Sequence, residues 1–444
     1  MTAEPAASRS RNAMTVVYDL VAAVVYSALW VSSWFSAYRR PVFLERSGRG
    51  AWEKIRNIPK KECVWVHASS MGEISGATPV VSALKAEFPH LPVIVTTTSL
   101  TGKAEATKRM PFVSAALLPI DRASVLHHAL GELRPQLLLI AETEIWPGLY
   151  AFAQEREIPI VIFNGRVSDR AFPRYRRLRF FFKHFLAIPR TLLVQTQLDA
   201  DRFRTLGAAA DRVRVTGCTK YDASALAPSE GDIKMLRQEV GFSESDQIIV
   251  AGSIRKGEEQ LMLDAYARVR VEFPNVRLIV APRHPERFDY FANLLEARGL
   301  EFYRRSANVV TRNVSVLLLD TMGELERFYP LGDVCIVGGG FLPLGGHNPL
   351  EPARFSKSPI VGPHMANFRD AVSQLIAAQA LTISSEAASL SAAISRRLKR
   401  PDESRYLGER AYVVWRNNQG ATAEVMDAVR IVLGNRPESR RAVS

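Results

Sequence analysis

The sequence predicts an α/β protein with two consecutive doubly wound domains, each built on a parallel sheet. Short runs rich in β-branched residues alternate with helical patterns from residue 39 onward. These runs form two series, and a segment at 223–232 that contains proline, serine and glycine separates them. Three of the runs lead into a glycine-containing turn followed by a helix start, which is typical of the ligand edge of such sheets.

Length and composition agree with this architecture and limit the functional classes. The chain has 444 residues, enough for two or three domains, and its 47% hydrophobic and 23% charged residues are typical of a folded protein. The formal charge of +13 favours acidic partners such as anionic lipid, phosphorylated substrates or nucleic acid. Three dispersed cysteines indicate buried, reduced thiols, and eight histidines without ligand spacing predict no metal site.

The first 38 residues are predicted to lie outside both domains. Residues 1–13 are predicted to be a disordered tail and 14–38 a membrane-anchor helix, since about 20 apolar residues span a bilayer. Arg39 and Arg40 follow at once, which places the globular part on the cytoplasmic side. Asp19 weakens the span, so a helix lying in the membrane interface is the alternative. A cleaved signal peptide is disfavoured, because no small-residue cleavage site precedes the arginines.

The N-terminal domain is predicted at 39–222 and the C-terminal domain at 233–403, followed by a C-terminal helix and tail at 404–444. Short β-branched runs bounded by turn residues predict the strands. The first series comprises Cys63–Ala68, Pro92–Thr98, Ala115–Asp121, Gln136–Glu144, Pro159–Asn164, Thr191–Thr196 and Val213–Gly217. The second comprises Gln247–Gly252, Val276–Ala281, Val314–Asp320, Val334–Val337, Pro359–Gly362 and Leu381–Ile383.

The most distinctive stretch is Gly338–Ala353. It follows the apolar run Val334–Val337, a predicted buried strand, and its glycines allow the backbone to bend sharply and approach a ligand. Asn348 is expected to cap a helix with Pro349 at its first position, so that unpaired N–H groups and the helix dipole would suit an anion or nucleotide. An ordinary strand–turn–helix corner is the alternative interpretation.

Two further corners place a glutamate three residues after a hydroxyl side chain. Ser70 and Glu73 have this capping-box spacing after the first strand, and Thr321 and Glu324 have it after a later one. Glu73 is therefore either a cap or a general base, and the helix N-terminus is expected to keep it ionised and weakly basic. The second corner is expected to present a helix N-terminus near Thr321 to a phosphate.

Four other charged side chains are candidates for binding a ligand or stabilising charge during a reaction. Arg283 follows a strand and could hold a phosphate, with a surface ion pair to Glu286 as the alternative. Glu142 and Glu144 end an apolar strand, where side chains face the ligand edge of such folds. Lys220 lies beside the linker and could meet developing negative charge, although exposed lysines are common.

The segment 174–185 is both basic and aromatic. It is either a solvated helix face with a core stripe behind it or an attachment surface for anionic membrane. No recognised nucleic-acid motif accompanies it, so no nucleic-acid partner is expected.

Six motifs, taken together, resemble those of the 3-deoxy-D-manno-octulosonic acid (Kdo) transferase family. They are His67-Ala-Ser-Ser-Met-Gly-Glu73, Glu142-Thr-Glu-Ile-Trp-Pro147, Pro282-Arg-His-Pro-Glu-Arg-Phe288, Asp320-Thr-Met-Gly-Glu-Leu325, Gly345-Gly-His-Asn-Pro-Leu-Glu-Pro-Ala353, and Gly362-Pro-His364 with Asn367-Phe368. The resemblance covers the chain from the anchor onward. It implies the two-domain GT-B glycosyltransferase fold, with the acceptor on the N-terminal domain and the nucleotide on the C-terminal one.

Carried over position by position, the resemblance also implies roles for individual residues. Glu73 would be the proton acceptor, and Glu142 and Lys220 would stabilise the transition state. The CMP-binding positions would be Pro282, Arg283, Met322, Gly323, Glu324, Asn348, Pro349, Leu350 and Glu351. Before the lysine, Cys218-Thr219 departs from the Asn-Leu pair that is usual in the family.

The resemblance thus implies an inverting, metal-independent transfer of Kdo from CMP-Kdo to a lipid A precursor, lipid IVA, in lipopolysaccharide core biosynthesis. The enzyme would work on the cytoplasmic face of the inner membrane, held by a single N-terminal anchor and by the anionic membrane surface. The enzymatic alternatives are a UDP-sugar-dependent GT-B glycosyltransferase and a sugar-nucleotide epimerase. A non-enzymatic membrane lipid-binding protein is a more distant alternative, and a dehydrogenase is disfavoured because no Gly-x-Gly-x-x-Gly follows the first strand. Oligomeric state, acceptor acylation and the number of Kdo residues stay open.

Overall fold

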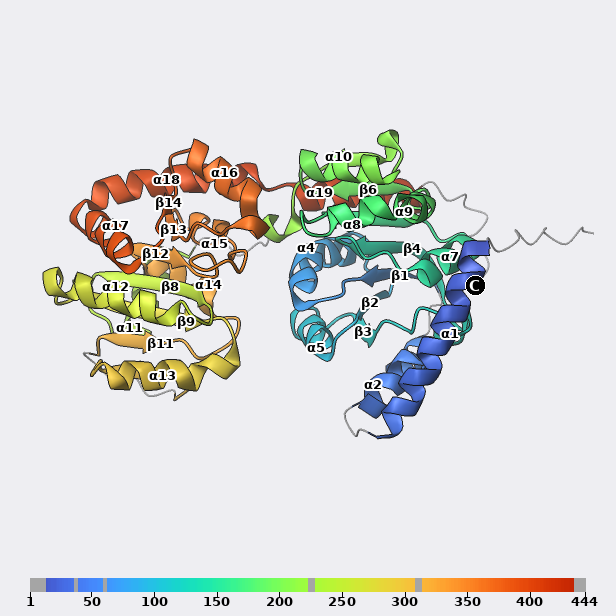
Figure 1. Ribbon diagram of the computed structural model, residues 1–444, viewed down its shortest axis with the longest axis horizontal. Coiled ribbons are helices and arrows are strands. Elements are labelled where there is room, and N and C mark those ends of the chain that lie inside the picture. The colour runs from blue at the N-terminus through green and yellow to red at the C-terminus, as the bar shows by residue number, and fades with distance from the viewer. Residues whose placement is uncertain (1–12, 36–38, 59–61, 223–227, 308–313, 435–444) are drawn as a thin grey trace, which may run out of the picture. The chain divides into compact units, whose positions relative to one another are not determined.

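A computed structural model describes residues 13–35, 39–58, 62–222, 228–307 and 314–434. The chain divides into two compact units (Figure 1): unit 1 comprises residues 1–224 and 419–444, and unit 2 comprises 225–418. Each unit contains a parallel sheet with helices on both faces, so the predicted fold class is confirmed at this level. The predicted tail at 1–13, apart from Ala13, and half of the predicted linker lie outside the described residues.

Unit 1 is built on a seven-stranded sheet with the order β3-β2-β1-β4-β5-β6-β7. The strands are β1 Glu62–His67, β2 Val93–Thr97, β3 Ser114–Leu117, β4 Arg134–Ala141, β5 Ile160–Gly165, β6 Thr191–Val194 and β7 Val213–Val215. All pairs are parallel, and the order reverses between the central strands β1 and β4. At such a reversal the loops at the carboxyl ends of the strands diverge, and ligands bind there in this class of fold.

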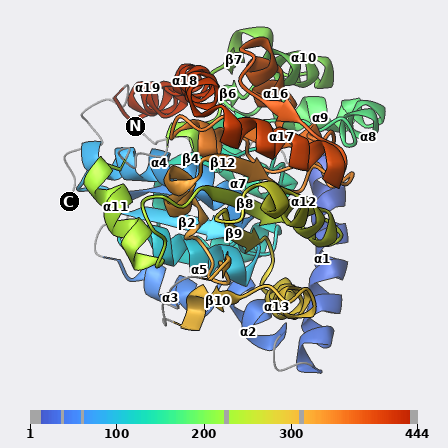
Figure 2. The same ribbon diagram turned by 90° about the vertical axis from the view of Figure 1, so that its left-hand side faces the viewer.

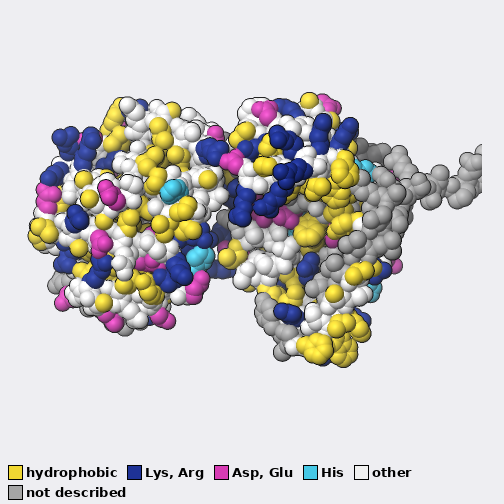
Figure 3. Space-filling view, in the orientation of Figure 1, with side chains coloured by type: hydrophobic (Ala, Val, Ile, Leu, Met, Phe, Trp, Pro, Cys, Tyr) yellow, Lys and Arg dark blue, Asp and Glu magenta, His cyan; other side chains and the backbone are white. Residues whose placement is uncertain are grey.

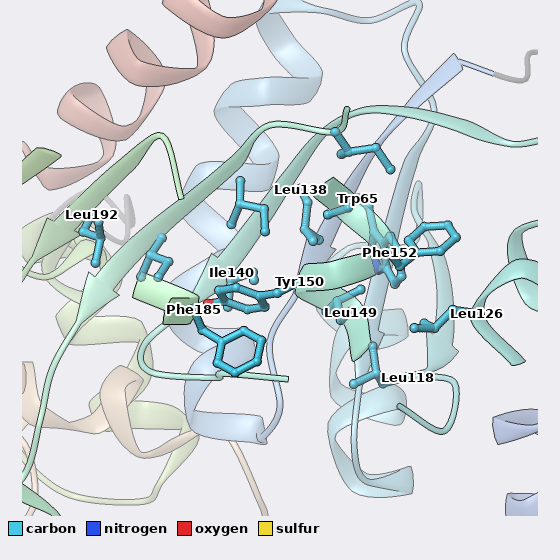
Figure 4. Close-up of a cluster of buried hydrophobic side chains, with 14 of the residues drawn as sticks. Trp65, Leu118, Leu126, Leu138, Ile140, Leu149, Tyr150, Phe152, Phe185 and Leu192 are labelled. Carbon is cyan, nitrogen blue, oxygen red and sulfur yellow. The ribbon is translucent and has the colours of Figure 1, made fainter. Parts of the chain in front are cut away.

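Helices cover both faces of this sheet. They are α3 Ala51–Arg56, α4 Met71–Glu87, α5 Leu100–Arg109, α6 Ala123–Leu130, α7 Pro147–Glu155, α8 Phe172–Arg177, α9 Arg179–Leu186, α10 Gln197–Leu206 and α19 Ala421–Gly434, with a short 3₁₀ turn η2 at Thr219–Asp222. On one face, Tyr150 of α7 and Phe185 of α9 pack edge-to-face beneath Leu138 and Ile140 of β4 (Figure 4). On the other face, α4 and α19 pack against strand residues such as Val64.

The C-terminal region differs from its prediction in one respect. The helical pattern at 404–433 forms two helices, α18 Pro401–Asn417 in unit 2 and α19 in unit 1. Buried side chains of α19, including Val425 and Val429, complete the core beside α4. The C-terminal helix is therefore an integral part of the N-terminal domain core.

The N-terminal helix α1 (Ala13–Trp34) is docked on unit 1, followed by α2 (Arg39–Arg46). The Tyr18 hydroxyl donates to Asp121 over 2.7 Å, and Asp19 accepts a hydrogen bond from Ala123 N over 3.2 Å. Asp19 is the charged residue that argued against a membrane-spanning helix. In the structure it accepts a hydrogen bond from the first residue of α6. Within the described residues, no helix combines the length and the apolar character needed to cross a lipid bilayer.

Unit 2 contains a second seven-stranded parallel sheet, with the order β10-β11-β9-β8-β12-β13-β14. The strands are β8 Ile248–Ile254, β9 Arg277–Pro282, β10 Phe302–Arg304, β11 Val316–Leu318, β12 Val334–Val337, β13 Pro359–Val361 and β14 Thr382–Ile383. The helices are α11 Glu230–Glu239, α12 Glu259–Glu272, α13 Phe288–Ala297, α14 Leu325–Phe328, α15 Leu350–Ala353, α16 Arg369–Ala377, α17 Ala387–Lys399 and α18. Helices α12 and α17 lie side by side on one face (Figures 1 and 2). All thirteen predicted strands are confirmed, whereas β10 was missed.

Candidate active site

In unit 1, functional side chains gather where β1 and β4 end. The chain leaves β1 at His67 and enters α4 at Met71, and it leaves β4 at Ala141 directly before Glu142. The 3₁₀ turn η2, which contains Lys220, packs against α4. The three residues Glu73, Glu142 and Lys220, which lie far apart in the sequence, thus belong to one edge of one sheet.

Glu73 occupies the first turn of α4 and is nearly buried, with 9% of its surface exposed. Ser70 caps the helix by accepting a hydrogen bond from Glu73 N, while the Glu73 carboxylate accepts from Ser69 N over 2.7 Å and lies 3.0 Å from Ser70 Oγ. Burial, followed by the negative charge of Glu142, raises the pKa of Glu73 to about 7. The expectation that the helix N-terminus makes Glu73 a weak base is therefore wrong, because desolvation and like charge outweigh these hydrogen bonds.

Lys220 pairs with Glu142. Its Nζ donates to Glu142 Oε1 over 2.9 Å, and both side chains are largely covered. Burial lowers the pKa of Lys220, but the charge of Glu142, the neighbouring Cys218 and the hydrogen bond to Glu142 together outweigh this effect, and the pKa is raised overall. Glu142 adopts a left-handed backbone conformation with φ 57°, which is rare outside glycine and asparagine and is often retained at functional sites. Lys220 is thus a half-buried partner of Glu142, unlike an ordinary surface lysine.

Asn164, which the sequence did not single out, holds η2 in place through Thr219. Buried Asn164 exchanges two hydrogen bonds with Thr219, one of 2.7 Å from its amide and one of 2.9 Å to its carbonyl. Thr219 also donates to Gly76 O in α4. A Cβ on Gly76 would lie 3.2 Å from the Lys220 stem, so the missing side chain lets η2 approach α4 closely. The Thr219 departure from the usual family motif therefore has a local hydrogen-bonding role.

In unit 2, the glycine loop after β12 is held by a buried carboxylate. Glu258 accepts hydrogen bonds from the backbone N–H groups of Arg255, Gly339 and Phe341 at 2.7–3.0 Å. Gly338 N is bonded to Gly252 O. The stretch 338–353 was expected to offer unpaired N–H groups to an anion, and for Gly338, Gly339 and Phe341 that expectation is wrong, because Glu258 and the backbone occupy these groups.

The helix after this loop is shorter than expected. Asn348 Oδ1 accepts a hydrogen bond from Leu350 N over 3.1 Å, but α15 covers only Leu350–Ala353 and Pro349 precedes it. Burial and then the charge of Glu326 raise the pKa of Glu351 to about 7, while the charge of Arg283 opposes them. The charge of Arg283 therefore acts on Glu351, so these two predicted nucleotide-binding residues lie near each other.

The corner at Thr321 also differs from its prediction. The helix expected to begin there, α14, begins at Leu325, after Gly323 with φ 86°. The Glu324 carboxylate accepts hydrogen bonds from Thr321 and, at 3.4 Å, from Arg305. The structure therefore provides no helix N-terminus at Thr321 for a phosphate. Met322 beside it is partly exposed, and Pro282 is buried at the end of β9.

Basic groups surround the end of the glycine loop. Burial, followed by the charges of Arg283, Arg255 and His284, lowers the pKa of His347 to about 3. In the described part of the chain, Arg283 forms no ion pair, so the alternative pairing with Glu286 is wrong. These cations could bind an anionic ligand by charge-assisted hydrogen bonds. Arg255 and His347 had not been predicted as site residues, although each lies close to glycines that follow a predicted strand.

Two units built on parallel α/β sheets resemble the fold of GT-B glycosyltransferases. A solved glycosyltransferase of Rickettsia africae shares this fold with a TM-score of 0.58 at 12% identity, covering 85% of this chain and 100% of that one.

Sequence comparison defines the family. The family described as "3-Deoxy-D-manno-octulosonic-acid transferase (kdotransferase)" matches residues 43–223. The 3-deoxy-D-manno-octulosonic acid transferase of Haemophilus influenzae is 32% identical and covers 84% of this chain and 88% of its own. That of Bordetella pertussis is also 32% identical, covering 94% of this chain and 99% of its own. The chain therefore belongs to the Kdo transferase family and is a glycosyltransferase.

Proposed function

We propose that the protein transfers Kdo from CMP-Kdo to a lipid A precursor, lipid IVA, with inversion at the anomeric carbon. The observation that carries this proposal is Glu73, a nearly buried carboxylate with a pKa of about 7 at the ligand edge of unit 1. Glu73 takes the proton from the attacking sugar hydroxyl, whose oxygen forms the bond to the anomeric carbon. The bond from that carbon to the phosphate of CMP breaks, and its electron pair leaves with CMP. A base with a pKa near the working pH suits this step.

The Glu142–Lys220 pair provides fixed charges beside the base. Positive charge develops on the sugar ring as CMP leaves, and a carboxylate stabilises it. Lys220 holds Glu142 through its 2.9 Å hydrogen bond in a half-buried environment. In this proposal Lys220 acts on the reaction chiefly through Glu142.

The donor nucleotide is assigned to unit 2. Arg283 and Arg255 supply positive charge for the phosphate, and Glu351 accepts hydrogen bonds from ribose hydroxyls. Arginines can neutralise the departing phosphate directly, so we propose that the transfer needs no metal. Transfer that is abolished by EDTA and restored by a divalent ion would contradict this part.

We further propose that the protein works at the cytoplasmic face of the inner membrane and that the N-terminal helix is its anchor. The tip formed by α1 and α2 exposes large apolar side chains (Figure 3), with Trp34 63% and Phe35 86% exposed. Because Tyr18 and Asp19 are bonded to unit 1, this anchor is expected to lie in the membrane interface. Arg39 and Arg40 follow it, in agreement with the cytoplasmic face.

A second surface supports membrane attachment. Exposed cations on α8 and α9 lie beside exposed Leu178 and Phe180, in the region where Figure 3 shows Lys and Arg side chains gathered. They are Arg174, Arg176, Arg177, Arg179 and Lys183. Among the ion pairs formed by described residues, none involves these five, so their charge is available to anionic lipid. Replacing the four arginines by glutamate should reduce flotation with anionic vesicles but not with neutral ones.

The direct test of the activity is mass spectrometry of lipid IVA incubated with the enzyme and an in situ source of CMP-Kdo. Addition of Kdo mass supports the proposal, and its absence contradicts it. CMP should inhibit competitively and UDP should not, which separates the proposed donor from that of a UDP-sugar-dependent enzyme.

A further inference from the structure

A buried histidine at the end of β1 has an unused ring nitrogen. His67 is completely buried, and its Nδ1 lies 3.1 Å from Thr96 Oγ1. Its Nε2 has no hydrogen-bond partner in the part of the chain that the structure describes. Burial lowers the pKa of His67 to about 3, so the imidazole is neutral at physiological pH. Leaving a buried polar atom unpaired costs about 1–3 kcal/mol, so such atoms usually mark a functional arrangement.

The group that faces this nitrogen is the Glu144 carboxylate. Glu144 Oε2 lies 4.0 Å from His67 Nε2. A neutral imidazole has one donor and one acceptor nitrogen, and Nε2 takes whichever role Nδ1 does not use against Thr96. An ionised Glu144 satisfies a donating Nε2, and a protonated one satisfies an accepting Nε2. A movement of about 1 Å would bring the two atoms to hydrogen-bond distance.

A second group holds the same carboxylate oxygen. Trp146 Nε1 donates to Glu144 Oε2 over 2.9 Å, and the Trp146 ring stands edge-on to His67 with centroids 6.4 Å apart. Oε2 is thus held by Trp146 and faces His67 Nε2 at 4.0 Å, while Oε1 accepts no hydrogen bond from a described residue. Glu144 keeps 24% of its side chain exposed.

Glu144 lies close enough to Glu73, the proposed base, to affect its pKa. Its negative charge is among the causes that raise the pKa of Glu73. Burial, with a smaller contribution from the charge of Glu142, raises the pKa of Glu144 against the hydrogen bond from Trp146. The carboxylate therefore belongs to the same cluster as the residues assigned to the reaction, yet it pairs with neither Lys220 nor the α4 cap. A carboxylate with one free oxygen beside a base that deprotonates a sugar is suited to accept a neighbouring sugar hydroxyl.

We propose that Glu144 binds the acceptor sugar, accepting through Oε1 a hydrogen bond from a hydroxyl next to the attacking one. His67 and Trp146 are positioning residues that fix its carboxylate through Oε2. This inference rests on the proposed glycosyl transfer and adds a determinant of acceptor recognition to it.

The test is steady-state kinetics with detergent-dispersed lipid IVA, varying acceptor and donor separately. Glu144→Gln should raise the acceptor KM about 10- to 100-fold, the range expected when a hydrogen bond to a charged group is lost, and leave the donor KM unchanged. Trp146→Phe and His67→Gln should raise the acceptor KM by smaller factors. Neither should raise it further in a protein that already carries Glu144→Gln, because both act through that carboxylate.

Two matched controls separate positioning from stability. Trp52→Phe removes another buried indole hydrogen bond, to Leu117 O, and His127→Gln removes the exposed histidine–glutamate pair with Glu155. Both should leave the acceptor KM unchanged. If His67→Gln does not fold, the Trp146→Phe and Glu144→Gln cycle decides the question.

An unchanged acceptor KM in Glu144→Gln, or additive effects of Trp146→Phe and Glu144→Gln, would overturn the inference. Its failure is distinguishable from failure of the proposed function. A Glu73→Gln protein with wild-type transfer refutes the proposed base, whereas an inactive Glu73→Gln protein together with a normal acceptor KM in Glu144→Gln refutes only the role of Glu144.

Discussion

Two corners of the molecule have the same short pattern and different chemistry. Ser70 and Glu73 in unit 1, and Thr321 and Glu324 in unit 2, both place a hydroxyl three residues before a glutamate at the end of a strand. The first corner opens the 17-residue helix α4, and the second precedes the four-residue helix α14. The charged groups around the Glu73 carboxylate also differ from those around the Glu324 carboxylate.

Electrostatic surroundings account for the difference. Burial, followed by the charges of Glu142 and Glu144, raises the pKa of Glu73 to about 7. Burial also raises the pKa of Glu324, but hydrogen bonds from Thr321 and Arg305 outweigh it, and that pKa lies below its ordinary value. A carboxylate with a depressed pKa is a poor base, so the same pattern yields a general base in one unit and a structural ion pair in the other.

The largest effect is expected on the rate of Kdo transfer when Glu73 is replaced, and the matching replacement of Glu324 serves as its comparison. Glu73→Gln should lower the single-turnover rate of Kdo transfer about 10²- to 10⁴-fold, because a general base is lost. Glu324→Gln should change this rate less than about tenfold, since it removes hydrogen bonds to a neighbouring arginine and no base. Equal losses in the two variants would contradict the distinction between the corners.

The next effect concerns the lysine of unit 1. Lys220→Ala should lower kcat about 10- to 100-fold, because it leaves the Glu142 carboxylate half-buried and unpaired. Lys103→Ala is a matched control, since Lys103 pairs with Glu45 over 2.6 Å and has the same 26% exposure as Lys220. Steady-state kinetics of both variants checks the prediction, and a similar kcat for the two would show that Lys220 has no special role.

In unit 2 the corresponding prediction is one of stability. Glu258→Ala should lower the free energy of unfolding by about 1–3 kcal/mol, because three backbone N–H groups of the glycine loop lose their buried acceptor. Glu272→Ala, which removes an exposed pair with Lys399, should cost about 0–1 kcal/mol. Urea denaturation measures both, and a Glu258→Ala protein as stable as the control would refute the role given to Glu258.

The smallest expected effect is a shift of the pH profile. The rate should rise as pH increases through about 7, because Glu73 must lose its proton to act as a base. Glu142→Gln removes a charge that raises this pKa, so the rising limb of kcat/KM should move to lower pH. A limb that does not move would show that Glu142 does not influence the base.

The contribution of Glu73 to the stability of the folded protein should fall as pH rises, whereas the rate of transfer should increase. The folded-state pKa of Glu73 lies above the ordinary value of 4.5, so its contribution to stability is present at low pH and is lost as pH rises through about 7. Glu73→Gln should therefore gain in Tm relative to the wild type at pH 8.5 and gain less at pH 5.5. Thermal unfolding at these two pH values measures the difference.

The sequence predicts the sheets well because buried parallel strands have a local signature. Runs such as Val334–Val337 are continuous and apolar, and they form strands as expected. Strand β10, Phe302–Arg304, was missed because it is short and ends in a charged residue at the sheet edge. The assignment of α19 to unit 1 depends on packing against α4, which no local pattern encodes.

The site is predictable in its residues but not in its electrostatics. The family resemblance points to Glu73, Glu142 and Lys220, and these residues lie at one edge of one sheet. The raised pKa of Glu73 depends on burial and on carboxylates that follow another strand, and the bonds of Glu258 to the glycine loop join distant segments. Such effects arise only from the tertiary fold.

The most direct test of the account is the pKa of the Glu73 carboxyl itself. A ¹³C NMR titration of protein labelled at glutamate carboxyls, with Glu73→Gln used to assign the signal, measures it without any substrate. The account predicts a value of about 7. A value at or below the ordinary 4.5 would mean that Glu73 stays ionised like Glu324, and the role of general base would lose its physical support.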